Sequence, residues 1–162
     1  MTGSDQSFEA FQERVKGTNI NEQTLLATDY LNHLNEPIML LEMLADVPEL
    51  IEELAEWKPK TYAEHFRDST FTDKELAIEA YEWSPERFRS RFERTVDSAN
   101  KCISTALEAL TKLQEQERTE SIRVVSTEVA TILGELVDKA SAIIHGEEEL
   151  LAQSDIDQIM NG

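Results

Sequence analysis

The strongest constraint on the fold is a pair of long apolar stripes with helical spacing in the second half of the sequence. Ser84-Pro85 is a helix start, because serine caps a first turn and proline fits the first helical position. Apolar residues then recur every three or four positions in two successive segments, which is the spacing of one helix face. The pattern predicts two long helices, 85–117 and 122–145, joined by a polar stretch.

Two consecutive long helices can bury their stripes against each other, so the sequence predicts an antiparallel helix hairpin. A third helix over 21–45 and shorter helices, including 5–16 and 48–57, complete an all-α helical bundle. Pro37 falls inside the third helix and is expected to kink or break it, because proline lacks the backbone donor. Few glycines and prolines, five and four in 162 residues, also favour helix.

Two threonines are expected to begin short helices in the broken middle of the chain, residues 60–83. Thr61 can cap a turn, and Thr72 with Glu75 has the spacing of a capping box.

The charge of the chain restricts its partners. It carries 33 acidic and 15 basic residues, a formal net charge of −18. Such a surface repels nucleic acid and anionic lipid, so we expect neither nucleic-acid binding nor membrane insertion. The N-terminus does not resemble a signal peptide, and the longest apolar run, Ile38 to Leu41, is too short to span a bilayer. With one cysteine, Cys102, and no internal disulfide, a cytoplasmic protein is expected.

The character of the sequence changes after Gly146, which divides the chain into a bundle, 1–146, and a flexible acidic C-terminal segment, 147–162. This segment holds five acids and no base. Ser154 and Asp157 have the spacing of a capping box, and three apolar residues beyond Ser154 are three and four positions apart. So short a helix is marginal in water but can fold in a partner's groove. The alternatives are a segment docked on its own bundle or a frayed end. The predicted partner-binding residues are Gln153, Ser154, Asp155, Ile156, Asp157, Ile159 and Met160.

Residues 151–162, LAQSDIDQIMNG, resemble the motif at the start of the flagellar motor switch proteins of the FliM family. They are similar, more loosely, to the C-terminal peptide of the chemotaxis phosphatase family CheZ. Ala152 stands where the motif usually has serine, and Met160 replaces a common leucine. In both families the peptide is an amphipathic helix that docks on the phosphorylated receiver domain of the response regulator CheY. The resemblance implies a module of bacterial chemotaxis or two-component signalling whose partner is a CheY-like receiver domain. The matching positions are Gln153, Asp155, Ile156, Asp157, Ile159 and Met160.

A possible second functional face lies on the predicted helix 21–45. Asp29, Asn32, His33 and Glu36 fall on one side of that helix, opposite its apolar stripe. Met39, Leu40 and Met43 continue the same side beyond Pro37. The simplest interpretation is that this side is solvated in its first half, with a surface histidine, and buried in its second half; a partner-binding face, a metal site and a phosphoacceptor histidine are alternatives. Di-iron bundles need the glutamate three residues before the histidine, and here the order is reversed. We therefore predict no metal and no cofactor.

An enzyme is not expected, because the sequence has no phosphate-binding glycine loop, catalytic triad or zinc spacing. The leading enzymatic alternative is a phosphatase of a phosphorylated receiver domain. Asp29 and Asn32 are similar to the acid–amide pair of the phosphatases CheC and CheX, whereas the acid–glutamine spacing of CheZ is missing from the predicted helices. The other alternative is a structural or oligomeric bundle, such as a homodimer paired through its long helices.

One basic cluster stands out in the acidic chain. It consists of Arg87, Arg89, Arg91 and Arg94 near the start of the first long helix. These arginines are expected to pair with nearby acids, or alternatively to bind an acidic receiver surface.

Overall fold

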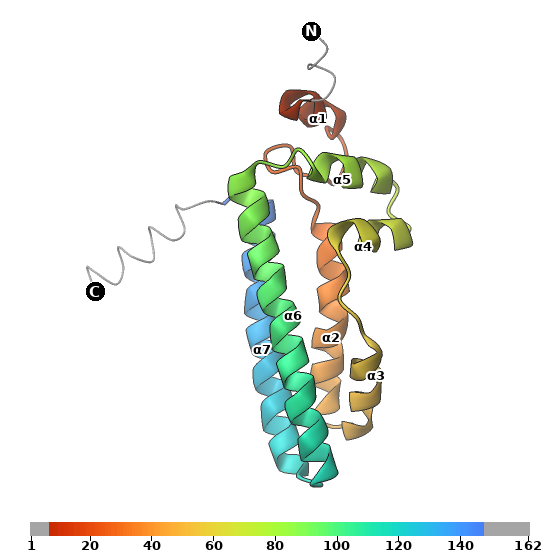
Figure 1. Ribbon diagram of the computed structural model, residues 1–162, viewed down its shortest axis with the longest axis vertical. Helices are drawn as coiled ribbons and strands as arrows, with labels where there is room; N and C mark the ends of the chain where they lie inside the picture. Colours follow the sequence, from red (N-terminus) through yellow and green to blue (C-terminus); the bar gives the residue numbers. More distant parts are fainter. Residues whose placement is uncertain (1–6, 148–162) are drawn as a thin grey trace, which may run out of the picture.

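The computed structural model describes residues 7–147 and is all-α within that range, as predicted, with one isolated β-bridge between Ile20 and Ala27 (Figure 1). The single-turn 3-10 helices η2 and η3 cover Thr28–Tyr30 and Pro48–Leu50. The predicted partner-binding residues Gln153 to Met160 lie outside the described residues. The α-helices are α1 (Phe8–Arg14), α2 (Leu31–Leu44), α3 (Ile51–Glu56), α4 (Tyr62–Asp68), α5 (Lys74–Tyr81), α6 (Glu86–Glu115) and α7 (Thr119–Ile144).

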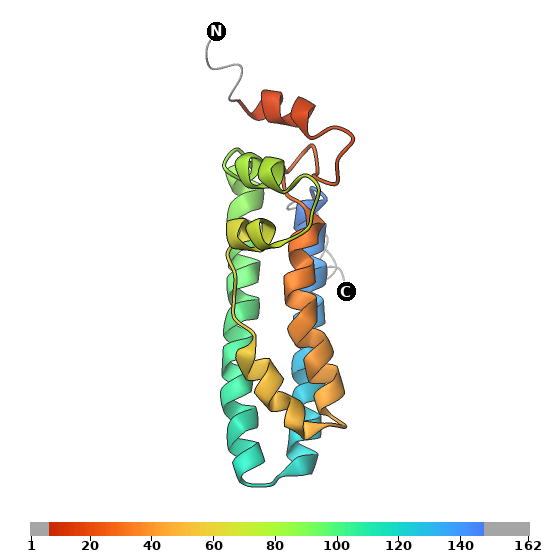
Figure 2. The ribbon, with the colours of Figure 1, turned by 90° about the vertical axis from the view of Figure 1, so that its right-hand side faces the viewer.

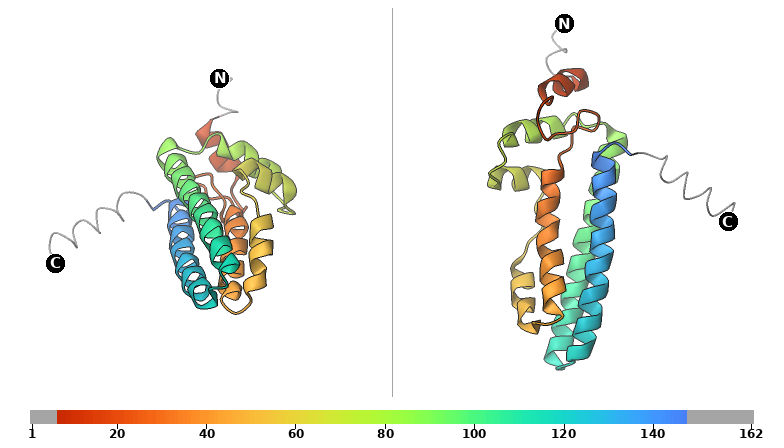
Figure 3. Two further views of the ribbon diagram at one scale, coloured as in Figure 1. Left: turned by 60° about the horizontal axis from the view of Figure 1, so that its bottom comes forward. Right: turned by 180° about the vertical axis from the view of Figure 1, so that it is seen from behind.

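The long helices lie side by side and define the long axis of the molecule. α6 and α7 pack against each other along their lengths, α2 packs on α7, and α3 contacts both α2 and α6 (Figures 1 and 2). The short helices α1, α4 and α5 gather at the end where α6 begins and α7 ends, which Figure 3 shows from behind. The core runs through this arrangement, and on α6 it consists of Phe88, Phe92, Ala99, Ile103, Ala106 and Leu110.

Both long helices end in a Schellman motif, in which a residue with positive φ reverses the backbone. After α6 that residue is Glu117, at φ 56°, and the N–H of Arg118 donates to the carbonyl of Leu113 at 2.9 Å. After α7 it is Gly146, at φ 88°, and the N–H of Glu147 donates to the carbonyl of Ala142 at 3.0 Å. The end of α7 at Ile144 thus lies within one residue of the end predicted for the helix 122–145.

The predicted helix 21–45 begins ten residues later than expected, because α2 starts at Leu31. Asn21 starts a turn instead: its Oδ1 accepts the backbone N–H groups of Gln23 and Thr24 at 2.8 and 2.9 Å. Leu25 has a φ of 59°, which no right-handed helix can contain. Local hydrogen bonds that the asparagine side chain accepts therefore replace the first turns of the predicted helix.

Pro37 does not break α2, which continues through it to Leu44. A proline leaves the carbonyl four residues earlier without its helical donor. Here that carbonyl belongs to His33, and it accepts the indole N–H of Trp57 at 3.1 Å. The hydrogen bond that proline removes from the helix is replaced by one from the segment that follows α3.

Only one of the two predicted threonine caps is present. Thr61 forms a full capping box with Glu64 at the start of α4, with bonds of 2.9 and 3.1 Å. The box predicted for Thr72 and Glu75 is wrong, because α5 begins with Asp73 at its N-cap and has no side-chain cap bond.

Candidate functional site

His33 is buried within the bundle and is not the surface residue that the simplest interpretation expected. Only 8% of it is exposed, and its ring stacks on the Trp57 indole with centroids 4.7 Å apart. The backbone N–H of Lys60 donates to Nε2 at 3.0 Å, so the neutral ring carries its proton on Nδ1. Burial lowers the pKa of His33 to about 4, helped by the neighbouring His65 and Lys60. A neutral ring with an occupied Nε2 serves as a structural acceptor.

Asp29 lies between two polar partners. Its Oδ2 is 3.0 Å from Nε2 of His65, a residue of α4, and its Oδ1 accepts the amide N–H of Asn32 at 3.2 Å. The two members of the acid–amide pair predicted from the sequence, Asp29 and Asn32, are therefore hydrogen-bonded to each other. Glu36 is exposed and lines a groove with His33 and with Glu53 and Glu56 of α3.

The fold bonds the Asp29 and Asn32 side chains to each other, while Glu36 lines one groove with His33 and another with Asn32. Among residues 7–147, no group of three histidine, cysteine or acidic side chains could hold a metal ion. His65 is the member of this cluster that sequence reasoning missed. Its signal was weak, because it lies 36 residues from its partner Asp29.

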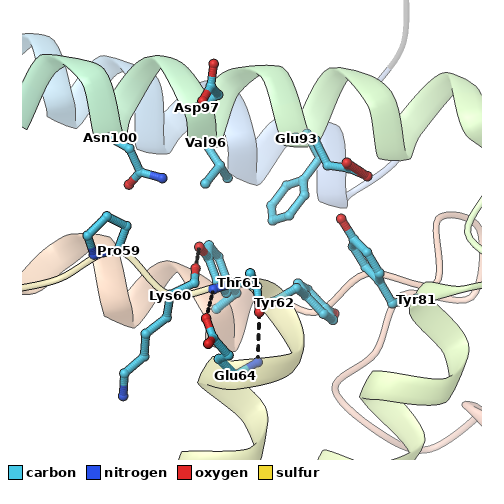
Figure 4. Close-up of a pocket in the computed structure, with 12 residues that line it drawn as sticks. Pro59, Lys60, Thr61, Tyr62, Glu64, Tyr81, Glu93, Val96, Asp97 and Asn100 are labelled. Atoms are coloured by element: carbon cyan, nitrogen blue, oxygen red, sulfur yellow. Dashed lines mark hydrogen bonds between the residues drawn. The ribbon is translucent and has the colours of Figure 1, made fainter.

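Tyr30 links this cluster to a pocket of about 290 Å³ between α6 and the segment 59–64 (Figure 4). Its ring contacts those of His65, Tyr62 and Phe92 at centroid distances of 5.3, 5.7 and 5.7 Å. No sequence pattern indicated this aromatic pocket, because its walls come from separate segments. The residues that line it are Tyr30, Pro59, Lys60, Thr61, Tyr62, Glu64, Tyr81, Phe92, Glu93, Val96, Asp97 and Asn100.

The hydroxyl groups of the aromatic pocket have partners inside the protein. Tyr30 donates to the carbonyl of Lys60 at 2.6 Å, and the Tyr62 oxygen accepts the N–H of Ala27 at 2.9 Å. Burial raises the pKa of Tyr30 to about 12, and it raises the pKa of Tyr62 and Tyr81 as well. These phenols stay protonated at physiological pH, so the pocket has no tyrosinate nucleophile.

Asn100 supplies the one fully buried side-chain polar atom within residues 7–147 that lacks a hydrogen-bond partner. Its Oδ1 is buried without a hydrogen bond, and Figure 4 shows the amide pointing from α6 toward Pro59 and Lys60. Asp97, by contrast, points away from the pocket, and its carboxylate lies 3.1 Å from the ammonium of Lys101. The arrangement fits a small, largely apolar group with an N–H donor and offers no assembled catalytic constellation among the described residues.

The arginines of the basic cluster separate on folding. Arg89 turns toward α5, donating to the carbonyls of Tyr81 and Glu82 at 3.2 and 3.0 Å, with Glu93 at 3.8 Å. The guanidinium of Arg87 lies over the Phe88 ring at 4.9 Å. Arg91 and Arg94 instead border a groove between α6 and α7. The expected pairing with nearby acids holds for Arg89.

Comparisons with known proteins do not place the chain in a family. No protein-family model matches the chain, and no curated protein or solved structure matches it. Among the helices of residues 7–147, none is long and apolar enough to cross a membrane.

Proposed function

We propose that the chain is a protein-interaction module of bacterial chemotaxis or two-component signalling, located in the cytoplasm. Its C-terminal segment, 147–162, binds a CheY-like receiver domain. The observation that carries this proposal is the pattern of 154–160. Ser154 and Asp157 can cap one short helix, and Ile156, Ile159 and Met160 form a single apolar side that matches the receiver-binding motif of the FliM family.

The end of α7 supports a boundary between bundle and binding segment. The Schellman motif at Gly146 stops the helix, so the chain does not extend α7 past residue 144 as a rigid rod. The receiver-binding side chains then belong to a separate unit that adopts its helix on the partner. Coupled folding of this kind costs affinity but permits switching by the state of the partner.

Receiver binding is testable with the full-length chain and its binding-segment variants. A receiver domain from the same organism, with and without beryllofluoride activation, is titrated with the chain and followed by fluorescence anisotropy. We expect saturable binding, with Ile156→Ala and Ile159→Ala each weakening it about tenfold or more, because anchors in a groove carry most of the binding energy. Gln158→Ala is the matched control, since this residue lies opposite the apolar side.

The outcome that rejects the proposal is an absence of binding to every receiver domain of the same genome. Equal affinity of Ile156→Ala, Ile159→Ala and wild type for an activated receiver would also exclude the apolar side as the contact.

A second candidate function is self-association of a bundle based on the antiparallel hairpin of α6 and α7. The observation that favours it is an exposed apolar row on α2, in the half of the helix side that the sequence predicted to be buried. Met39 is 60% and Met43 52% accessible, and both border one groove with Leu40. Exposed apolar side chains that cluster mark association surfaces.

Sedimentation velocity tests this candidate. If the chain associates through α2, it sediments as a dimer and Met39→Glu/Met43→Glu sediments as a monomer, because two carboxylates cannot be buried across a symmetric interface. Thr111→Glu, at an exposed position of α6, should leave the dimer intact. A monomeric wild-type chain at high concentration removes this candidate.

A further inference from the structure

The aromatic pocket differs from three other grooves of the described residues in the composition of its walls. Tyr30, Tyr62, Tyr81 and Phe92 all line it. The grooves along α2, between α2 and α7, and between α6 and α7 have no aromatic side chain in their linings. The volume of about 290 Å³ gives room for roughly ten non-hydrogen atoms, at about 30 Å³ for each water-sized group. The pocket therefore suits a small ligand with an apolar body.

Two polar side chains lie at opposite ends of the pocket, on the same side of α6. Glu93 and Asn100 are seven residues apart, which is two helical turns, or about 10 Å at a rise of about 1.5 Å per residue. Val96 lies between them and also lines the pocket. Figure 4 shows Glu93 near Tyr81 at one end and Asn100 near Pro59 at the other. A ligand that spans the pocket thus meets a polar group at each end.

The Asn100 amide forms no hydrogen bond within residues 7–147, and its Oδ1 is fully buried. A buried acceptor that lacks a donor is unfavourable. Pro59, toward which the amide points in Figure 4, has no backbone N–H to donate. Asparagine rotates broadly about χ2, so the amide can turn its Oδ1 toward a ligand N–H and its Nδ2 toward a ligand carbonyl. This end of the pocket matches a neutral amide, which has both groups.

Glu93 supplies a carboxylate at the opposite end. It is exposed, and Figure 4 shows its carboxylate beside the Tyr81 hydroxyl. Nε of Arg89 lies 3.8 Å from Oε1 of Glu93, which is too long for a hydrogen bond. A carboxylate can accept about four hydrogen bonds, so Glu93 has capacity left for a ligand donor. Because this end is open to water, an ammonium group bound there keeps part of its hydration.

The remaining polar groups of the lining favour a cation over an anion. Lys60 is the one basic residue of the lining; its side chain extends away from α6 in Figure 4, and its ammonium lies 3.1 Å from Asp68. The backbone N–H of Thr61 donates to Glu64 at 2.9 Å. An anion would therefore meet carboxylates and a lysine that is already paired. An ammonium group meets Glu93, on a chain whose formal net charge is −18.

We propose that the aromatic pocket binds an aliphatic ammonium ion whose other end is a neutral amide. The ammonium group lies at Glu93, the chain lies against Val96 and Tyr81, and the amide pairs with Asn100. An aliphatic amine has a pKa of about 10.4, as in lysine, so it is charged at physiological pH. A lysine residue of a peptide and a free amino amide share this chemistry. The site does not rest on receiver binding.

Titration of the full-length ¹⁵N-labelled chain, followed by NMR at constant ionic strength, tests the site. The probe is 5-aminopentanamide, and we expect saturable shifts of the amide signals of Thr61, Val96 and Asn100. Pentylamine lacks the amide and pentanamide lacks the ammonium group, so each should bind about tenfold more weakly. Nα-acetyl-lysine methylamide distinguishes the sources. Tighter binding than that of the probe assigns the ligand to a lysine residue of a peptide, and weaker binding assigns it to a free small molecule.

Two variants each remove one end of the site. Glu93→Gln should weaken binding of the probe and of pentylamine about tenfold and leave that of pentanamide unchanged. Asn100→Ala should weaken binding of the probe and of pentanamide and leave that of pentylamine unchanged. This variant should fold normally, because the amide has no hydrogen bond to lose within the described residues. Glu108→Gln, at an exposed position of α6 outside the pocket, is the matched control and should leave all affinities unchanged.

Three results would overturn the proposal. One is an absence of saturable shifts at the pocket. Another is shifts of similar size at exposed acids such as Glu52 and Glu128, which would reflect attraction of any cation by the acidic surface. The third is an affinity for the probe that stays unchanged in Glu93→Gln or in Asn100→Ala.

Discussion

Replacing Tyr62 with alanine is expected to lower the free energy of unfolding by about 4 kcal/mol, within the range for large buried aromatic residues. Tyr62 is 5% exposed, and its ring stacks on Tyr81 of α5 at a centroid distance of 4.3 Å. It also contacts Phe66 at 4.8 Å and, edge to face, Phe92 of α6 at 5.9 Å. Its removal leaves a cavity where three helices meet, and their backbones cannot collapse into it without losing other contacts.

The variant Tyr62→Phe separates the ring from its hydroxyl. It keeps the stacking but leaves the buried N–H of Ala27 without its acceptor, which costs about 1–3 kcal/mol. Urea denaturation followed by circular dichroism measures both variants. A smaller loss for alanine than for phenylalanine would show that the aromatic junction does not stabilise the bundle.

The long helices were predictable because their signals are local. The predicted segments 85–117 and 122–145 correspond to α6 at Glu86–Glu115 and α7 at Thr119–Ile144. Gly146 follows the end of α7, and the 3.6-residue period fixes the buried side. Ser84-Pro85 correctly indicated where α6 begins, but the predicted cap is wrong: Pro85 is the N-cap, and the Ser84 hydroxyl donates to the carbonyl of Thr24 at 2.6 Å. The period repeats along the whole of each long helix, so a single distant contact cannot override it.

The course of α2 could not be predicted, because a contact distant in sequence decides it. Pro37 alone favours a kink, and its tolerance depends on Trp57, whose indole donates to a carbonyl 24 residues earlier. At the start of the predicted helix 21–45, the Asn21 side chain accepts two backbone N–H groups and begins a turn. The spacing of apolar residues carries no signal for such a turn.

Prediction of the candidate site from the sequence is limited by distant contacts in the same way. Helical geometry correctly places Asp29 and Asn32 on one side, where they bond. It cannot show that Trp57 and the backbone of Lys60 cover His33, or that His65 completes the pair with Asp29. The aromatic pocket depends even more on tertiary structure, since α6 supplies one wall and segment 59–64 another.

Lowering the pH is expected to destabilise the chain through His33. Its pKa is about 4 in the folded protein and 6.5 when unperturbed, so the unfolded state takes up the proton first. The contribution of neutral His33 to stability is therefore complete above pH 6.5 and is lost as the pH falls toward 4. At about 1.4 kcal/mol per pKa unit, the full loss is on the order of 3 kcal/mol.

The variant His33→Phe isolates this effect from the titration of the many carboxyl groups. Phenylalanine can keep the stacking on Trp57 but offers no acceptor to Lys60, so the variant should be less stable than wild type at pH 7.5. Between pH 7.5 and 4.5 the wild-type chain loses the His33 contribution and the variant has none to lose, so the difference in unfolding free energy should shrink by about 2–3 kcal/mol. His145→Gln, at an exposed position after α7, is the control and should follow the wild-type profile. A difference between wild type and His33→Phe that stays constant over this range would mean that His33 is not held neutral by its burial against Trp57.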